Sequence, residues 1–368
     1  MKLPFTHQRS VTMSIFGAAI LVSLFIWGCS GSGDSPMSPA AVDNGLSLAN
    51  PKIAAIVPIQ ERHTKEIMAN PDVLGTAVTL NENGEPAIMV LVSNTATSKI
   101  ALTELEGVPV QLVYTDKIVA KKGGGGVSHT AKQTPPIQLG TSGGWRKDLA
   151  NGFCCGGTLG ALIQVGGNQR ILSNYHVFEA DIVNGGNGTT AQTGDFIIQP
   201  GLIDVGCNAA NAQNVATLVK TSSLPGSNVD ASSATVITGM VRTDGAILEV
   251  GTVSSSTVGA SIGQAVKKSG RTSGLTRSTV GGLNATVSVS YENECAGGIA
   301  FTKTFSGQIL VNRGGRFLQG GDSGSLMVED VTTNPRAVGL LFAGSSQVAI
   351  ANPIGQVLSF FGGTMVGN

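Results

Sequence analysis

The stretch Gly320-Gly321-Asp322-Ser323-Gly324-Ser325 is the most informative part of this sequence of 368 residues. A serine hydroxyl is a poor nucleophile unless a base takes its proton, and its reactions need backbone N–H donors aimed at the developing oxyanion. Glycines on both sides of Ser323 allow a sharp turn and a close approach to another molecule. We interpret Ser323 as a candidate nucleophile, with the amides of Gly321 and Ser323 as oxyanion donors. The alternative is a glycine-rich hairpin with an incidental serine, in a chain with 51 glycines.

A base and an acid that could serve Ser323 precede it in the chain. His176 is the only histidine between 145 and 368, and it follows the apolar run at 171–172, where a strand is expected to end. The acid that orients such an imidazole must come from another segment. Asp230 is our preferred candidate, because it lies where a polar loop passes into small apolar residues. Asp204 is the runner-up, and the other carboxylates considered are Asp181, Asp195, Asp244 and Asp322.

Residues 145–368 have the pattern of an all-β domain. Apolar runs of strand length recur between turn residues, which predicts antiparallel barrels or a sandwich. The expected strands are 158–165, 171–174, 215–221, 279–291, 299–311, 325–328, 337–343 and 348–351. One helix is expected at Ile354–Phe361, after Pro353. The fold class is therefore mainly β.

Taken together, these motifs resemble the trypsin/chymotrypsin superfamily of serine peptidases, in its bacterial branch. The order His–Asp–Ser matches, as do Ser-Asn-Tyr-His-Val at 173–177, Asn-Val-Asp-Ala at 228–231 and Gly-Asp-Ser-Gly at 321–324. The segments 270–276 and 338–344 resemble the opening of the second barrel and the strand that pairs with substrate backbone. The resemblance covers 145–368 and implies two six-stranded barrels, with His176 and Asp230 from the first and Ser323 from the second.

The resemblance also implies roles for four further residues and differs from the family in two places. It assigns Phe317, Phe342, Ala343 and Gly344 to substrate binding. Phe317 stands where trypsin has an acid, so a preference for basic side chains is not expected, and Arg313 and Arg316 nearby are candidates to attract an acidic one. Phe342 replaces a serine that supports the acid in many animal members, so Asp230 must be held differently. Because 140–144 lacks the usual apolar start, activation by a new N-terminus buried against Asp322 is not expected.

The N-terminal 144 residues divide by composition into four segments. Residues 1–29 read as an export segment that has a positive start, an uncharged apolar core and Gly28-Cys29, which resembles a lipoprotein signal with Cys29 lipidated. Residues 30–50 read as a flexible tether. Residues 51–120 predict a small α+β module with a helix at 59–68 and strands at 73–80, 87–92 and 108–114. Residues 121–144 form a Gly- and Pro-rich linker, whose basic start is a candidate nicking site.

The amino-acid composition limits the classes of partner that we expect. The net charge is zero and only 12% of residues are charged, so nucleic acid is not an expected partner. In an exported chain, Cys154, Cys155, Cys207 and Cys295 predict up to two disulfides with three connectivities, although the neighbours Cys154 and Cys155 should not bond to each other. Their spacing matches no zinc signature. We expect no metal and no cofactor.

The expected function is a serine endopeptidase that hydrolyses peptide bonds of protein or peptide substrates. Two alternatives remain open at this stage. One is a catalytically silent binding protein on a trypsin-like scaffold, because fold alone does not confer activity. The other is a self-processing peptidase with 51–120 as its pro-segment. The expected location is exported, either anchored to a membrane through lipidated Cys29 or secreted or periplasmic.

Overall fold

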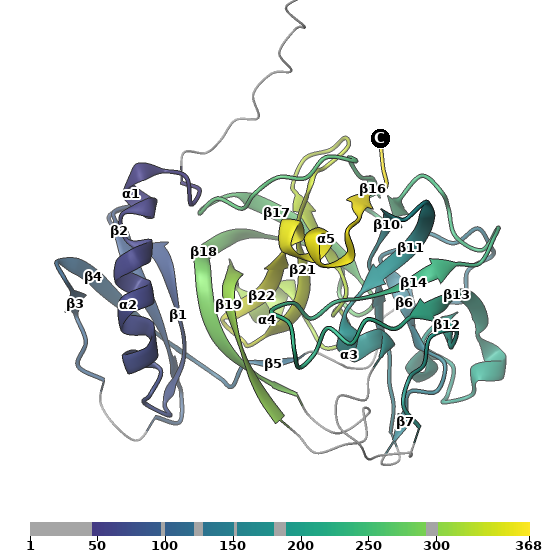
Figure 1. Ribbon diagram of the computed structural model, residues 1–368, viewed down its shortest axis with the longest axis horizontal. Helices are drawn as coiled ribbons and strands as arrows, with labels where there is room; N and C mark the ends of the chain where they lie inside the picture. The colour runs from purple at the N-terminus through teal and green to yellow at the C-terminus, as the bar shows by residue number, and fades with distance from the viewer. Residues whose placement is uncertain (1–45, 97–99, 121–127, 151–152, 180–188, 292–300) are drawn as a thin grey trace, which may run out of the picture. The chain divides into compact units, whose positions relative to one another are not determined.

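The computed structural model describes residues 46–96, 100–120, 128–150, 153–179, 189–291 and 301–368. The export segment, Cys29, most of the tether and Cys295 lie outside the described residues, as do 121–127 of the second linker. The described chain is mainly β with few and short helices, as the sequence predicts (Figure 1). No helix within the described ranges is long and apolar enough to cross a bilayer.

The first barrel is built from one antiparallel sheet. Its strands run in the order β23-β10-β11-β14-β13-β12-β6-β9. Because β9 continues through Gly160 directly into β10, the two form one bent strand that pairs with β6 through β9 and with β11 through β10, and the barrel closes. The bounds are β6 Thr141–Trp145, β9 Gly157–Leu159, β10 Ala161–Val165, β11 Asn168–Ser173, β12 Phe196–Gln199, β13 Gln213–Val219, β14 Ser232–Val236 and β23 Thr364–Met365.

The second barrel closes through β17. That strand pairs with β18 on one side and with β20 on the other, so the order β17-β20-β21-β22-β19-β18 returns to its start. The bounds are β17 Ala265–Gly270, β18 Gly274–Tyr291, β19 Phe301–Asn312, β20 Leu326–Glu329, β21 Ala337–Gly344 and β22 Val348–Pro353. Two closed antiparallel barrels, each of six strands when β9 and β10 count as one and the short β23 on the edge of β10 is left out, confirm the predicted fold class.

Apolar packing fixes these elements in place. The interior of the first barrel holds Trp145, Leu162 and Ile171, all fully or almost fully buried. All residues of β21 are buried, because the strand lies between its neighbours in the sheet and covering segments on both faces. The closing helix α5 (Ile354–Phe361) buries Ile354 and Val357 in an apolar cluster to which strands of both barrels contribute. Burial of such side chains contributes roughly 1.5–3 kcal/mol each.

Short elements lie before and between the barrel strands, and one of them, α3, carries His176. They are η1 Ser128–Thr130, β7 Leu149–Ala150, β8 Phe153–Cys154, α3 Tyr175–Phe178, η2 Leu202–Asp204, η3 Ala209–Asn211, β15 Ala246–Ile247, β16 Gly251–Thr252 and α4 Gly314–Phe317.

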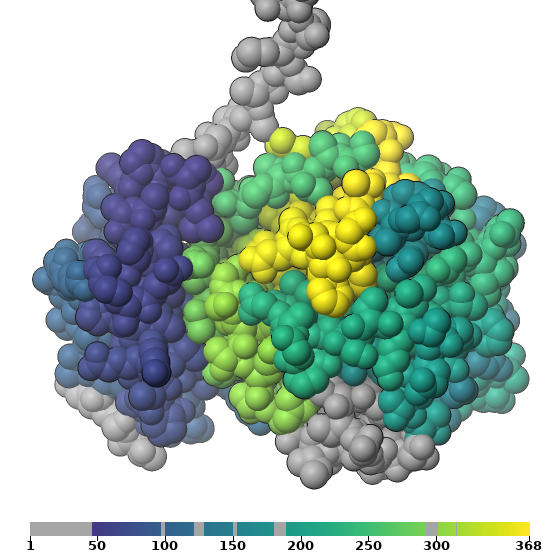
Figure 2. Space-filling view, in the orientation of Figure 1, coloured from purple at the N-terminus to yellow at the C-terminus, as the bar shows by residue number. Residues whose placement is uncertain are grey.

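Residues 51–120 form the expected helix and strands, but their sheet is continuous with the second barrel. The elements are α1 Pro51–Ala54, α2 Val57–Ile67, β1 Val73–Leu80, β2 Pro86–Ser93, β3 Glu104–Leu105, β4 Val108–Thr115 and β5 Val119–Ala120. β1 pairs antiparallel with β18, which joins β1, β2, β4 and β3 to the barrel sheet. Figure 2 shows these residues, in purple and blue, against the light green β18–β19 segment. The sequence did not predict this pairing.

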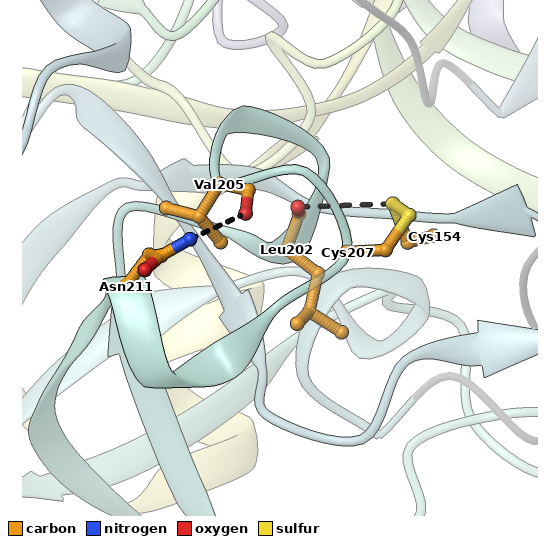
Figure 3. Close-up of a disulfide and its surroundings, with 5 residues drawn as sticks. All are labelled: Cys154, Leu202, Val205, Cys207 and Asn211. Atoms are coloured by element: carbon orange, nitrogen blue, oxygen red, sulfur yellow. Dashed lines mark hydrogen bonds between the residues drawn. A yellow bond between two sulfur atoms is a disulfide. The ribbon is translucent and has the colours of Figure 1, made fainter.

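A disulfide between Cys154 and Cys207 fastens β8 to the loop after η2 (Figure 3). Within the same loop, the side-chain amide of Asn211 donates to the backbone carbonyl of Val205 (Figure 3). The bridge confirms that Cys154 does not bond to its neighbour Cys155. A pairing that involves Cys295 remains a prediction.

Candidate active site

His176 is positioned at the end of β11 by the single-turn helix α3. The residue before this helix, Asn174, is extended, with φ −85° and ψ 157°, which ends the strand and starts the turn. All four residues of α3 are buried. The side chain of Asn174 donates to the carbonyl of Asp230 at 2.7 Å and so ties this turn to the segment that carries the acid.

His176 and Asp230 form a buried pair. The imidazole Nδ1 lies 2.6 Å from Oδ2 of Asp230, and the exposed fractions of the two side chains are 4% and 0%. Because an ionised carboxylate only accepts hydrogen bonds, Nδ1 is the donor and Nε2 of the neutral ring is left as a potential acceptor. Within the described part of the chain Nε2 has no hydrogen-bond partner. This is the arrangement that a general base requires.

The second barrel holds Asp230 from the other side. The hydroxyl of Tyr291, at the end of β18, donates to Oδ2 of Asp230 at 2.8 Å. The Asp230 amide donates at 3.0 Å to the side-chain oxygen of Asn352, whose amide in turn donates to Gln308 at 2.6 Å. Burial, and then the charge of Asp230, raise the pKa of Tyr291 well above its usual value, so the phenol is neutral and donates. These contacts replace the support missing at Phe342.

Ser323 lies in the turn before β20, in a backbone shape that glycine makes possible. Gly321 and Gly324 have φ of 95° and 93°, a region that other residues rarely adopt. A Cβ on Gly324 would lie 2.2 Å from Oγ of Ser173 in β11. The carbonyl of Ser323 accepts from the amide of Thr158 in β9 at 2.8 Å. The turn that carries Ser323 therefore contacts strands β9 and β11 of the first barrel.

Ser323 lies close to the turn that carries His176, but its hydroxyl makes no hydrogen bond to Nε2 of His176. A Cβ on Gly157 would meet the carbonyl oxygen of Ser323 at 2.9 Å and the side chain of Val177, the residue after His176, at 2.6 Å. The hydroxyl of Ser323 donates to the carbonyl of Phe342 at 3.2 Å. Catalytic hydrogen bonds are often long or unformed without substrate.

Asp322 does not contact the imidazole but anchors the turn. Its carboxylate lies 3.1 Å from the ammonium of Lys268 in β17, and both side chains are fully buried. It also accepts from the amides of Thr272 at 2.9 Å, Ser273 at 3.0 Å and Gln319 at 2.9 Å. Burial lowers the pKa of Lys268, and the charge of Asp322 opposes that change. Lys268 thus gives Asp322 a partner without a new N-terminus.

Replacing Lys268 with methionine is expected to lower the free energy of unfolding by about 3–5 kcal/mol, because the buried carboxylate of Asp322 loses its counter-ion. Chemical denaturation of the two proteins measures the difference. The matched control is the double variant Lys268→Met, Asp322→Asn, which removes both charges and should recover part of the loss. Equal stability of Lys268→Met and wild type would show that the pair does not anchor the turn.

Asp204, the runner-up acid, lies elsewhere. Its carboxylate pairs with the guanidinium of Arg271, with Nε to Oδ2 at 2.7 Å, and also accepts from the hydroxyl of Ser142 at 2.5 Å. Arg271 is almost fully buried. Asp204 therefore ties the first barrel to the start of the second, and the structure places Asp230 beside His176.

The four residues assigned to substrate binding are divided between two buried rings and the end of strand β21. The rings of Phe317 and Phe342 are almost completely buried in apolar clusters. Ala343 and Gly344, at the end of β21, pair with Ala120 and Val119 of β5 in antiparallel register. The strand expected to bind a substrate backbone is therefore paired with a segment of the same chain.

Sequence reasoning missed Tyr291, Asn352 and Lys268. Lys268 follows Lys267 on β17, and both are buried, so the alternation of side chains along a strand does not single out Lys268. Tyr291 and Asn352 lie on strands whose apolar pattern reveals burial but not the partner. No group of three metal-binding side chains is found among the residues placed by the structure.

Comparison with known proteins gives a partial family match and distant structural similarities. The profile of the Nal1 C-terminal domain family matches residues 206–352, which include Asp230 and Ser323 but not His176. Among curated proteins, none matches the chain.

Three of the similar solved structures are proteases. A glutamic acid specific serine protease is 19% identical with TM-score 0.40, covering 62% of this chain and 100% of its own. Protease A of Thermobifida fusca is 19% identical with TM-score 0.38, covering 58% and 92%. Cellulomonas bogoriensis chymotrypsin is 20% identical with TM-score 0.36, covering 57% and 91%. At these identities and TM-scores, no residue role is transferred from those proteins, and the chemistry of the site is argued from the side chains of this chain.

Proposed function

We propose that this chain is a serine endopeptidase with Ser323 as nucleophile, His176 as general base and acid, and Asp230 as the group that orients the imidazole. The observation that carries the proposal is the buried hydrogen bond between Nδ1 of His176 and Asp230, which leaves Nε2 as an acceptor. Its substrates are proteins or peptides, and the reaction uses no metal or cofactor. The chain acts after export, attached through Cys29 or released.

The reaction proceeds by acyl transfer to water. Rotation of the Ser323 side chain away from the carbonyl of Phe342 brings Oγ to Nε2 of His176. Oγ attacks the peptide carbonyl while Nε2 takes its proton, and the amides of Gly321 and Ser323 donate to the oxyanion. The imidazolium then protonates the leaving amine. Water enters with His176 again as base, and the acid chain departs from Ser323.

A fluorophosphonate probe tests this assignment, because it reacts covalently with an activated serine. We expect labelling of the wild-type chain and none of Ser323→Ala. Ser325→Ala is the matched control, since its hydroxyl lies in the same turn but donates to the carbonyl of Asp322 at 2.5 Å, and it should label like wild type. A folded wild-type chain that does not react would favour a binding protein on this scaffold.

A second candidate function is self-processing, and the position of β5 favours it. Val119 and Ala120 pair antiparallel with Gly344 and Ala343, the strand end to which the family resemblance assigns the backbone of a substrate. Ile118 is fully buried, and its carbonyl accepts from the amide of Ser290 at 3.0 Å, which holds this segment in place. The chain itself thus supplies a substrate-like strand at β21, and residues 51–120 serve as the pro-segment.

Self-processing predicts cleavage in the basic stretch that follows Ala120. Intact-mass measurement of freshly purified wild-type chain should find two fragments that divide the chain within 121–127. Ser323→Ala, purified in parallel, should remain whole. Identical masses for the two proteins would rule out self-cleavage, and β5 would then be a permanent competitor for substrate.

A further inference from the structure

Tyr291 makes contacts that go beyond those of a core aromatic residue. It ends β18, is 4% exposed, and its hydroxyl donates at 2.8 Å to the carboxylate oxygen of Asp230 that also accepts from Nδ1 of His176. One oxygen, Oδ2, therefore receives both donors. At the other oxygen of Asp230, the one donor found among the residues that the structure describes is the backbone amide of His176 at 3.4 Å, which is too long for a strong bond.

The ring of Tyr291 is held rigidly. It stacks on Phe301 of the neighbouring strand with centroids 4.8 Å apart and an interplanar angle of 6°. It meets the imidazole of His176 edge-on, at 5.9 Å and 66°. Tyr291 and Phe301 also face each other in the β18–β19 register. A phenol fixed on three sides has little freedom to point its hydroxyl elsewhere.

We propose that Tyr291 is a positioning residue of the triad, which orients Asp230 through its hydroxyl and sets the basicity of His176. The inference rests on the proposed function. A donor at Oδ2 spreads the negative charge of the carboxylate and weakens its attraction for the imidazolium. It also prevents rotation of the carboxyl group. Loss of the Tyr291 hydroxyl should therefore strengthen the attraction between Asp230 and the imidazolium of His176.

Other ionisable groups around His176 are few. α3 itself carries Glu179, whose buried carboxylate accepts from Ser232, Thr221 and Ser222 and points into that set of donors. The strands packed against α3, β6 and β14, have no ionisable side chain. Among the described residues, Asp230 and Tyr291 are therefore the ionisable groups that the structure places against the imidazole of His176.

The experiment compares Tyr291→Phe with wild type in the full chain, with Tyr114→Phe as control, because Tyr114 is about half exposed on β4. Tyr291→Phe keeps both ring contacts and loses only the hydroxyl. Histidine-selective NMR titration should give a higher pKa for His176 in Tyr291→Phe. The pH profile of fluorophosphonate labelling should shift its acid limb to higher pH, and the plateau rate should fall on the order of tenfold. Tyr114→Phe should match wild type in all three.

The outcomes separate the two proposals. If wild type is labelled but Tyr291→Phe has an unchanged pKa for His176 and an unchanged profile, Tyr291 is a packing residue and the inference is overturned. If wild type is not labelled at all, the proposed function fails, while the NMR titration still decides whether the phenol sets the pKa of the imidazole. Denaturation of each variant checks that a rate change does not come from unfolding.

Discussion

Replacing Ser323 with alanine is expected to lower the rate of peptide hydrolysis about a millionfold, because the substitution removes the oxygen that we propose forms the acyl intermediate. His176→Ala should cost a similar factor, since an unactivated hydroxyl does not attack an amide at a useful rate. The two losses should not add in the double variant, because the residues act as one unit. The measurement is the turnover of a fluorogenic peptide selected from a library by wild-type cleavage.

Both substitutions should leave the fold intact. The hydroxyl of Ser323 donates to the carbonyl of Phe342 at 3.2 Å, a neutral hydrogen bond whose loss typically costs only about 1 kcal/mol of stability. Denaturation midpoints near that of wild type would show this. Residual turnover of Ser323→Ala within tenfold of wild type would mean that another nucleophile is responsible.

Changing Asp230 to asparagine is expected to reduce turnover roughly ten-thousandfold. The neutral amide neither stabilises the imidazolium nor fixes the tautomer with its proton on Nδ1. The measurement uses the same fluorogenic peptide, at several pH values. The loss should be somewhat smaller than that of Ser323→Ala, because the nucleophile and the oxyanion donors remain.

Asp204→Asn is the matched control for Asp230→Asn. Asp204 contacts Arg271 and Ser142 and not His176, so turnover should stay within about tenfold of wild type while stability falls, because a buried guanidinium loses its charged partner. If Asp204→Asn were the more damaging substitution for turnover, the assignment of Asp230 as the orienting acid would be wrong.

Local sequence patterns predicted much of the fold. The strand expected at 73–80 and the helix at 354–361 have these bounds in the structure, because period and turn residues mark where such elements begin and end. The apolar run before His176 likewise ended as a strand at Ser173. The ends of these strands and of this helix depend on residues adjacent in sequence, so they can be predicted without a structure.

Long-range partners were not predictable in the same way. The pairing of β1 with β18 and of β5 with β21 joins segments whose patterns say only that they are strands. Phe342 indicated that Asp230 needed a different support, but the donor proved to be Tyr291, which is 61 residues away in sequence. The partner of Asp322 was likewise hidden, because a buried lysine is identified by its counter-ion and not by its neighbours in the chain.

The most direct test of the account is a crystal structure of the chain after reaction with a peptidyl phosphonate. The account predicts a covalent bond from phosphorus to Oγ of Ser323, with a phosphonate oxygen near the amides of Gly321 and Ser323. Nε2 of His176 should lie within hydrogen-bond distance of the adduct, and Nδ1 should remain bonded to Asp230. An adduct on a different side chain, or an imidazole out of reach of both the adduct and the carboxylate, would contradict it.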